Sequence, residues 1–117
     1  MAREKFSLVI ITFDNADTLE RCLAAADFAD EIVVLDSGST DATVEIAKRH
    51  GARVATHPFD DYGPQKQRAI DMASHDWILN LDADEILSPG TRVMIERALE
   101  NPDVAGFRLP RRERMFW

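Results

Sequence analysis

The chain has 117 residues, of which 45% are hydrophobic and 30% charged, and its net charge is −7. This length allows one domain with a sizeable core but not two, and the composition is that of a folded globular protein. The negative charge argues against a general nucleic-acid-binding protein, because phosphate backbones require a positively charged surface.

Strand-like and helix-like segments alternate along the chain. Short, nearly continuous apolar runs predict buried strands, and apolar residues spaced three and four apart predict helices. In chain order, the pattern predicts strands at 7–12, 31–35, 52–56, 77–81 and 104–109, and helices at 17–27, 41–49, 64–73 and 89–100. This alternation predicts an α/β fold with a mostly parallel sheet and helices on both faces.

Capping residues mark several of the predicted helix ends. Asp41 is expected to be the N-cap of the second helix, and Gly51 is expected to end that helix. Pro64 is expected at the first position of the third helix, after a polar loop at 58–62. Ser88, followed by Pro89, marks the start of the fourth helix.

Two features bear on where the protein works. Cys22 is the only cysteine, so no disulfide forms within the chain, which fits a reducing compartment such as the cytoplasm. Its position on the apolar face of the first predicted helix favours a core residue over a nucleophile. The sequence has no signal-peptide core after Met1 and no apolar stretch of about 18 residues, so we expect no transmembrane segment.

Asp82 and Asp84 flank one small residue directly after the predicted strand at 77–81. The carboxyl ends of parallel strands lie at the edge where open α/β sheets bind ligands. If the chain stays extended past the strand, residues two apart point the same way. Two such carboxylates suit Mg²⁺ or Mn²⁺, with phosphate oxygens completing the coordination. A solvated turn with an aspartate cap is the alternative interpretation, because two aspartates this close also occur by chance.

Two other polar segments, residues 12–15 and 36–41, follow strands and should lie along the same edge. Asp36 ends a strand and small residues follow it, so its carboxylate can accept hydrogen bonds from a nucleobase or a ribose. A well-capped turn between a strand and a helix explains the segment equally well. The chain contains neither G-x-G-x-x-G nor G-K-[ST], which disfavours a dinucleotide-binding fingerprint and a P-loop.

Four segments together resemble the first half of a family 2 glycosyltransferase with the GT-A (Rossmann-like) fold. They are residues 8–12, 30–41, 63–69 and 76–85, in the order and with the spacing of the family. The motifs D-S-G-S-T-D (residues 36–41) and G-P-Q-K (residues 63–66) are most similar to those of bacterial enzymes that add a hexose to the lipopolysaccharide inner core. The resemblance implies that residues 1–117 form the nucleotide-sugar-binding portion of such a domain, truncated before the acceptor half.

The resemblance also implies roles for individual residues. Thr12 would line the nucleotide pocket, and Asp36 would bind the uracil edge. Asp82 would contact the ribose or the sugar, and Asp84 would hold Mg²⁺ or Mn²⁺ on the pyrophosphate.

Other residues complete the expected nucleotide-sugar-binding set. Lys66 and Arg68 would reach the phosphates, although a solvated helix face explains them equally well. The family usually has Asn-Glu where this chain has Asp14 and Asn15. Asp14 keeps a short polar acceptor, but the usual glutamate is missing. The remaining members of the set are Ser37 and Ala83.

The resemblance implies an inverting, metal-dependent transfer of a hexose from a UDP-sugar to a lipopolysaccharide-core, lipid-linked or related glycan. Such transfer needs a general base, which the family places beyond Trp117, and Glu85 is a poor substitute. The last residues, 115–117, are large and apolar, and such groups normally become buried. We therefore expect the sequence to belong to a longer protein, and the isolated chain to be inactive.

Other interpretations stay open on the sequence alone. A sugar-1-phosphate nucleotidyltransferase uses a related site, but it would need a Gly-rich basic loop where this chain has residues 14–17. A nucleotide-binding module, or an inert fragment without turnover, is the non-enzymatic alternative. The basic segment 107–117 fits either contact with anionic lipid at the inner face of the bacterial plasma membrane or packing on the missing half. An exposed sheet edge or apolar patch would allow a homodimer.

Overall fold

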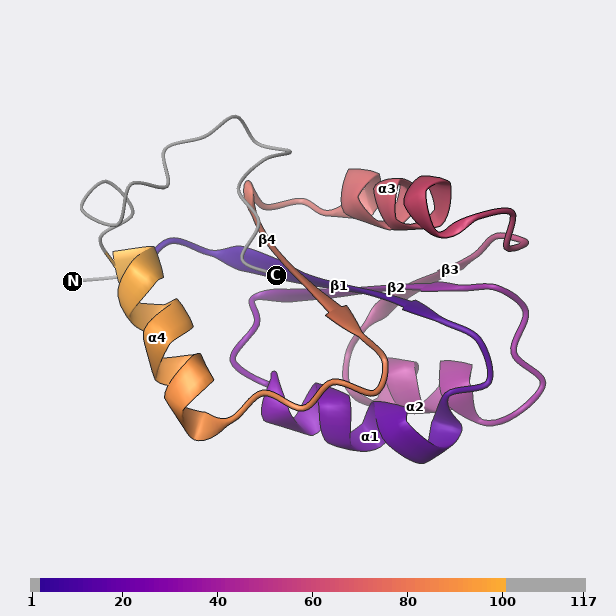
Figure 1. The fold of residues 1–117 in the computed structure, drawn as a ribbon, viewed down its shortest axis with the longest axis horizontal. Coiled ribbons are helices and arrows are strands. Elements are labelled where there is room, and N and C mark those ends of the chain that lie inside the picture. The colour runs from indigo at the N-terminus through magenta and orange to yellow at the C-terminus, as the bar shows by residue number, and fades with distance from the viewer. Residues whose placement is uncertain (1–2, 101–117) are drawn as a thin grey trace.

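Four parallel strands form the sheet at the centre of the structure (Figure 1). The computed structural model describes residues 3–100 of the chain. The sheet has the order β3-β2-β1-β4, and every pair of neighbours runs parallel. The strands are β1 Phe6–Thr12, β2 Glu31–Asp36, β3 Arg53–Thr56 and β4 Trp77–Asp82.

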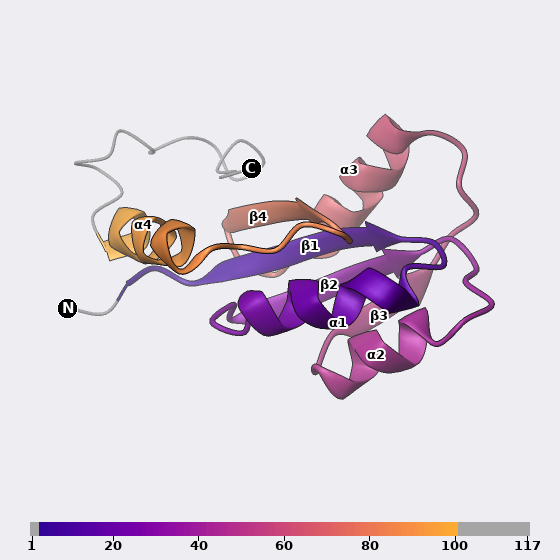
Figure 2. The same ribbon diagram turned by 60° about the horizontal axis from the view of Figure 1, so that its bottom comes forward.

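Helices cover both faces of this sheet. Figures 1 and 2 show α1 and α2 on one face and α3 on the opposite face, while α4 lies beside the start of β1. The backbone N–H of Glu4 donates to the carbonyl of Leu99 at 2.9 Å and so joins the segment before β1 to the end of α4. The helices are α1 Ala16–Ala25, α2 Thr43–Arg49, α3 Tyr62–Met72 and α4 Pro89–Glu100.

Alternate side chains of β1 enter two separate hydrophobic cores. Leu8 and Ile10 pack in the larger core with residues of α1, α2 and α4, whereas Val9 packs in the smaller core with residues of α3. All three side chains are fully buried. Because both faces of the strand are covered, its sequence is apolar at nearly every position instead of alternating. Packing therefore fixes the helices, and the polar loops are left at the ends of the strands.

The structure confirms the predicted α/β fold with a parallel sheet and helices on both faces. The predicted apolar face of α1 is buried, and Gly51 ends α2 with a φ of 79°, a conformation that glycine adopts without strain. Within residues 3–100, no helix is both long enough and apolar enough to cross a membrane.

Three predictions concern the end of the chain and lie outside the described residues. They are the strand at 104–109, the basic segment 107–117, and the general base that the family resemblance places beyond Trp117. The structure describes the chain only to residue 100, so it tests none of the three, and each stays a prediction.

The start of α2 differs from the prediction. The helix begins at Thr43 after Ala42, so Asp41 is not its N-cap. The carboxylate of Asp41 instead accepts the N–H of Thr43 at 3.0 Å and the N–H of Ala16 at 3.1 Å. Asp41, which the sequence predicted as the cap of α2, therefore links the first turns of α1 and α2.

The start of α3 also differs, by two residues. The helix begins at Tyr62, because the carboxylate of Asp61 accepts the Tyr62 N–H at 2.8 Å and provides the cap. Pro64 is consequently the third helical residue and not the first. It remains within the first turn, where a backbone N–H has no partner inside the helix and its absence costs little.

Ser88 caps α4 as predicted, and its Oγ accepts the backbone N–H of Thr91 at 3.1 Å. We expect Ser88→Ala to lower the free energy of unfolding by about 1 kcal/mol, because this N–H then loses its partner. In a domain of this size the melting temperature should fall by roughly 4–8 °C, which circular dichroism can follow. Ser88→Asn keeps a side-chain acceptor and should retain most of the stability; an equal loss in both variants would contradict the cap.

Candidate functional site

The carboxyl ends of β1, β2 and β4 open onto a cavity of about 1080 Å³ at one edge of the sheet. Parallel strands produce this arrangement, because all their carboxyl ends point to the same edge. The segment at the start of α3 closes another side. The cavity is lined by Ile11, Thr12, Phe13, Asp14, Asn15, Asp17 and Thr18 at and after the end of β1, Ser37 after β2, Pro58, Phe59, Tyr62 and Lys66 around the start of α3, and Asp82, Ala83 and Asp84 at and after the end of β4.

Most of the predicted site residues are brought together by this cavity. Asp36 and Arg68 are the two members of the predicted set that do not line it. Lining a cavity does not show what a residue binds, so the roles expected from the sequence stay predictions. The members that line it are Thr12, Asp14, Ser37, Lys66, Asp82, Ala83 and Asp84.

The loops after β1 and β2 are joined by hydrogen bonds at the wall of the cavity. Asp14 donates its N–H to Ser39 Oγ at 2.8 Å, and its Oδ1 accepts the N–H of Thr40 at 2.8 Å. The N–H of Asn15 donates to Thr43 Oγ1 at 2.8 Å. Asp14 has a φ of 51°, in the left-handed region that aspartate tolerates better than most residues. Asp14 therefore shapes the wall and lines the cavity at the same time.

Asp36 ends β2 next to Ser37, which lines the cavity, and only 1% of Asp36 is exposed. Its Oδ1 accepts the hydroxyls of Thr12 at 2.7 Å and Ser39 at 2.5 Å, and its Oδ2 accepts the N–H groups of Gly38 at 2.9 Å and Ser39 at 2.7 Å. These four bonds occupy the acceptor sites of a carboxylate. Asp36 thus organises the loop after β2, and its contact with uracil stays a prediction.

The same hydrogen bonds set the protonation of Asp36. Burial raises the pKa of this carboxyl, but the hydrogen bonds from Ser39, Thr12 and Gly38 together outweigh burial and lower the pKa from its ordinary value. The group is therefore ionised near neutral pH, with its charge stabilised inside the protein.

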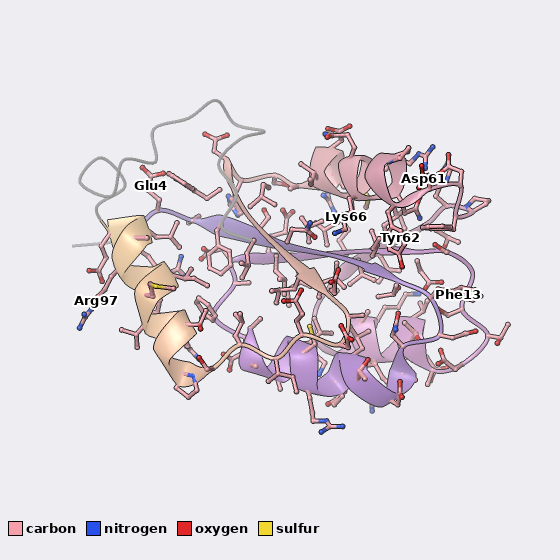
Figure 3. All side chains as sticks on the ribbon, viewed as in Figure 1. Glu4, Phe13, Asp61, Tyr62, Lys66 and Arg97 are labelled. Atoms are coloured by element: carbon pink, nitrogen blue, oxygen red, sulfur yellow. The ribbon has the colours of Figure 1, made fainter. Side chains whose placement is uncertain are left out.

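Asp82 is the last residue of β4, and Asp84 lies in the tight turn that follows, so the chain does not stay extended between the two carboxylates as expected from the sequence. Glu85 Oε1 accepts the N–H of Asp82 at 2.8 Å, and the Glu85 N–H donates to the Asp82 carbonyl at 3.0 Å. Lys66 Nζ lies 3.7 Å from Asp82 Oδ1, and Figure 3 shows Lys66 reaching from α3 toward the sheet. Asp84 is exposed, and no residue in the described part of the chain hydrogen bonds or ion pairs with its carboxylate.

The charge of the cavity bears on the ligand that it can hold. Four carboxylates and one ammonium group line it, a net charge of −3 when all are ionised, so an anion is repelled unless a cation is also present. Among residues 3–100, no three His, Cys, Asp or Glu side chains are grouped to hold a metal by themselves. The oxygens of Asp82 and Asp84 nevertheless fit a divalent cation that takes its other ligands from phosphate and water, as Mg²⁺ commonly does.

Arg68 is not brought to the cavity. Its guanidinium donates to both carboxylate oxygens of Asp60, at 2.8 and 2.7 Å, and to Gln65 Oε1 at 3.0 Å. The hydrogen bonds from Arg68 hold the pKa of Asp60 well below its ordinary value. This pair fixes the loop between β3 and α3, so of the two cations expected at the phosphates only Lys66 lines the cavity.

Sequence reasoning missed the aromatic part of the cavity. Phe13, Phe59 and Tyr62 line it and are 57%, 50% and 65% exposed. Figure 3 shows Phe13 and Tyr62 at the end of the molecule opposite α4. The signal for them was present in the sequence, because all three are aromatic residues in or next to polar loops that follow strands.

Cys22 is buried beneath the site, and its Sγ lies 3.7 Å from the backbone oxygen of Asp82. Burial, with smaller contributions from the carboxylates of Glu85, Asp84 and Asp82, raises the pKa of the Cys22 thiol to about 12. A thiol that stays protonated is a poor nucleophile. The structure therefore confirms Cys22 as a core residue.

The parallel sheet and the cavity at its carboxyl edge define a Rossmann-like α/β domain, the architecture expected of the GT-A fold. The sequence profile of the family described as Glycosyl transferase family 2 matches residues 7–117. The chain therefore belongs to glycosyl transferase family 2.

Relatives and solved structures agree with this assignment. The chain is 45% identical over 94 residues to an uncharacterized glycosyltransferase of Rickettsia bellii, with 80% of this chain and 32% of the relative covered. It is 33% identical over 112 residues to the lipopolysaccharide core biosynthesis glycosyltransferase LpsC of Rhizobium meliloti, with 91% and 42% covered. The chain thus spans less than half the length of these curated relatives.

A similar solved structure is glucosyl-3-phosphoglycerate synthase from Mycobacterium tuberculosis in complex with UDP. It superimposes with a TM-score of 0.62 and 29% identity, with 71% of this chain and 35% of that chain covered. Another structure of the same enzyme contains Mn²⁺, UDP and glucosyl-3-phosphoglycerate, with a TM-score of 0.60 and 28% identity over 68% of this chain and 33% of that chain.

Proposed function

We propose that residues 1–117 form the donor-binding portion of an inverting, metal-dependent glycosyltransferase that takes a hexose from a UDP-sugar. The observation that carries the proposal is the cavity at the carboxyl edge, where Asp82, Asp84 and Lys66 come together from β4 and α3. The similarity to a synthase solved with UDP, and with Mn²⁺ and UDP, supports the donor and the metal.

The charged residues of the cavity have complementary roles in this proposal. Asp82 and Asp84 would hold Mg²⁺ or Mn²⁺, which when bound stabilises the negative charge of the departing nucleoside diphosphate. The ammonium group of Lys66 would exchange its ion pair with Asp82 for a phosphate oxygen. Because this ion pair is long, at 3.7 Å, and partly exposed, the exchange costs little.

The acceptor we propose is a sugar of the lipopolysaccharide core or a related glycan. The similarity to LpsC, a lipopolysaccharide core biosynthesis glycosyltransferase, supports this choice. The enzyme would act in the cytoplasm, and the basic segment 107–117 would contact the inner face of the membrane. Transfer also requires a general base for the acceptor hydroxyl. No described residue is assigned to that role, and we propose, from the family resemblance, that the base lies beyond Trp117.

Calorimetric titration of UDP-glucose into the chain in the presence of Mn²⁺ tests the donor. We expect saturable binding of UDP-glucose and UDP, with no transfer to lipopolysaccharide-core oligosaccharides. The reason is that a positioned base is worth roughly 10²–10⁴-fold in rate. Failure of every UDP-sugar to bind would contradict the donor assignment, and robust transfer by this chain alone would contradict its description as a donor-binding portion.

A further inference from the structure

Within residues 3–100, every exposed phenylalanine, tyrosine or tryptophan lines the same cavity. Phe13, Phe59 and Tyr62 are each at least half exposed, whereas the other aromatic rings are buried or half-buried. A single exposed apolar side chain is ordinary on a protein surface. Three aromatic rings around one largely polar cavity are not, and they indicate a ligand with a flat apolar part.

Two of these rings form a pair. The ring centroids of Phe59 and Tyr62 are 5.1 Å apart, and the ring planes meet at 78°, an edge-to-face contact. This geometry is favoured between aromatic rings, and it turns only the edge of one ring toward the other. The contact therefore leaves both faces of the ring whose edge is turned uncovered by the other ring.

Phe59 lies in the loop between β3 and α3, which hydrogen bonds hold in place, and Tyr62 is the first residue of α3. Gln65 is fully buried, and its side-chain amide donates to the carbonyl of His57 at 3.1 Å and to Ser37 Oγ at 3.2 Å. Asp60 is held by two hydrogen bonds from Arg68. Because both ends of the loop are tied, little conformational freedom remains to be lost when a ligand contacts Phe59.

The cavity has a charged side and an aromatic side. Asp82 is the last residue of β4 and Asp84 follows it, whereas Phe59 precedes α3 and Tyr62 is the first residue of that helix. The strands β3 and β4 are the two outer strands of the sheet. A nucleoside diphosphate has the same division, with a metal-binding diphosphate at one end and a flat base at the other. An aromatic ring can stack on any base, because every base presents a π face.

We propose that Phe59 and Tyr62 form the stacking surface for the base of the nucleoside diphosphate, an inference that rests on the proposed donor site. Stacking depends little on which base is bound, so this surface contributes affinity for any nucleoside. Contacts at the edge of the base would determine the selectivity between uracil and cytosine. Gln65 is a positioning residue for the same surface, because it holds the loop that carries Phe59.

The test replaces both rings by leucine, which keeps apolar bulk but removes the π face. In the presence of Mn²⁺, the Phe59→Leu/Tyr62→Leu chain should bind UDP and CDP at least roughly tenfold more weakly than the unmodified chain, the loss expected for a stacked base. Its affinity for inorganic pyrophosphate, which has no base, should be unchanged. Phe59→Tyr/Tyr62→Phe keeps two rings and should restore the nucleotide affinity.

Lys66→Met is the matched comparison, because it should weaken UDP and pyrophosphate alike. If the leucine variant bound UDP as tightly as the unmodified chain, the stacking surface would be refuted while the donor site stood. If the leucine variant also bound pyrophosphate more weakly, the two rings would stabilise the fold of the cavity and would not stack on the base. A chain that bound neither UDP nor pyrophosphate before mutation would refute the donor site itself.

Discussion

Asp84→Asn should remove most of the gain in UDP affinity that Mn²⁺ gives to the unmodified chain. The Asp84 carboxylate is exposed to the cavity and unengaged by the described residues, so an ion carried by the diphosphate can take it as a ligand. Loss of residues that merely support metal ligands already costs roughly 10–100-fold in metal affinity, so we expect a loss of at least this order. Titration calorimetry of UDP with Mn²⁺, and again with a chelator, measures the gain.

Asp17→Asn provides the control for charge, because it removes one negative charge from the same cavity at the first turn of α1. If Asp84 is a ligand, Asp17→Asn should keep most of the metal-dependent gain. Equal losses in the two variants would mean that the metal-dependent gain in UDP affinity depends only on the net charge of the cavity. Equal affinity of the unmodified chain for UDP with Mn²⁺ and with a chelator would exclude the metal from this site.

Local sequence patterns predicted the fold because the pattern and the packing here depend on the same residues. The nearly continuous apolar run of β1 reflects burial on both of its faces, as in a central parallel strand. Parallel pairing then places the segments after β1, β2 and β4 at one edge, which is why most of the candidate site could be predicted before its geometry was known.

The parts that could not be predicted depend on pairings between distant residues. Nothing in the sequence around Arg68 indicates that Asp60, eight residues earlier, takes its guanidinium away from the cavity. Asp41 could be recognised as a capping residue, but not as one that also bonds Ala16, 25 residues away. In each case a charged group has several partners within reach, and three-dimensional packing selects among them.

The same limit applies to Asp36, for which the family resemblance implies contact with uracil. Its two oxygens already accept four hydrogen bonds from Thr12, Gly38 and Ser39, and the residue is 1% exposed. Direct recognition of a base would require at least one of these bonds to be replaced. A role in positioning requires no change, because the carboxylate already holds the loop that carries Ser37 into the cavity.

Asp36→Ala should therefore affect both folding and binding. Removing the carboxylate leaves the buried Thr12 hydroxyl without its acceptor, while the N–H groups of Gly38 and Ser39 can turn to water. We expect the free energy of unfolding to fall by about 3 kcal/mol at pH 7. Because the folded-state pKa of Asp36 is lowered, the part of this stability that depends on the ionised carboxylate is present above the ordinary aspartate pKa of about 3.9 and is lost as the pH falls through the folded-state value. Denaturant unfolding at pH 7 and pH 3 follows the difference.

Binding by the same Asp36→Ala chain, at a temperature where it is folded, separates the two roles of Asp36. If Asp36 positions the loop, UDP and CDP should both weaken by the same factor, roughly 10-fold or more. Thr12→Val removes one of the four hydrogen bonds and keeps the shape of the side chain, so it should produce a smaller loss that is also equal for the two nucleotides. If Asp36 instead accepts the N3–H of uracil, its removal should weaken UDP far more than CDP, because cytosine has no hydrogen at N3. A selective loss of UDP would thus restore direct recognition of the base, and an equal loss would assign Asp36 to the loop.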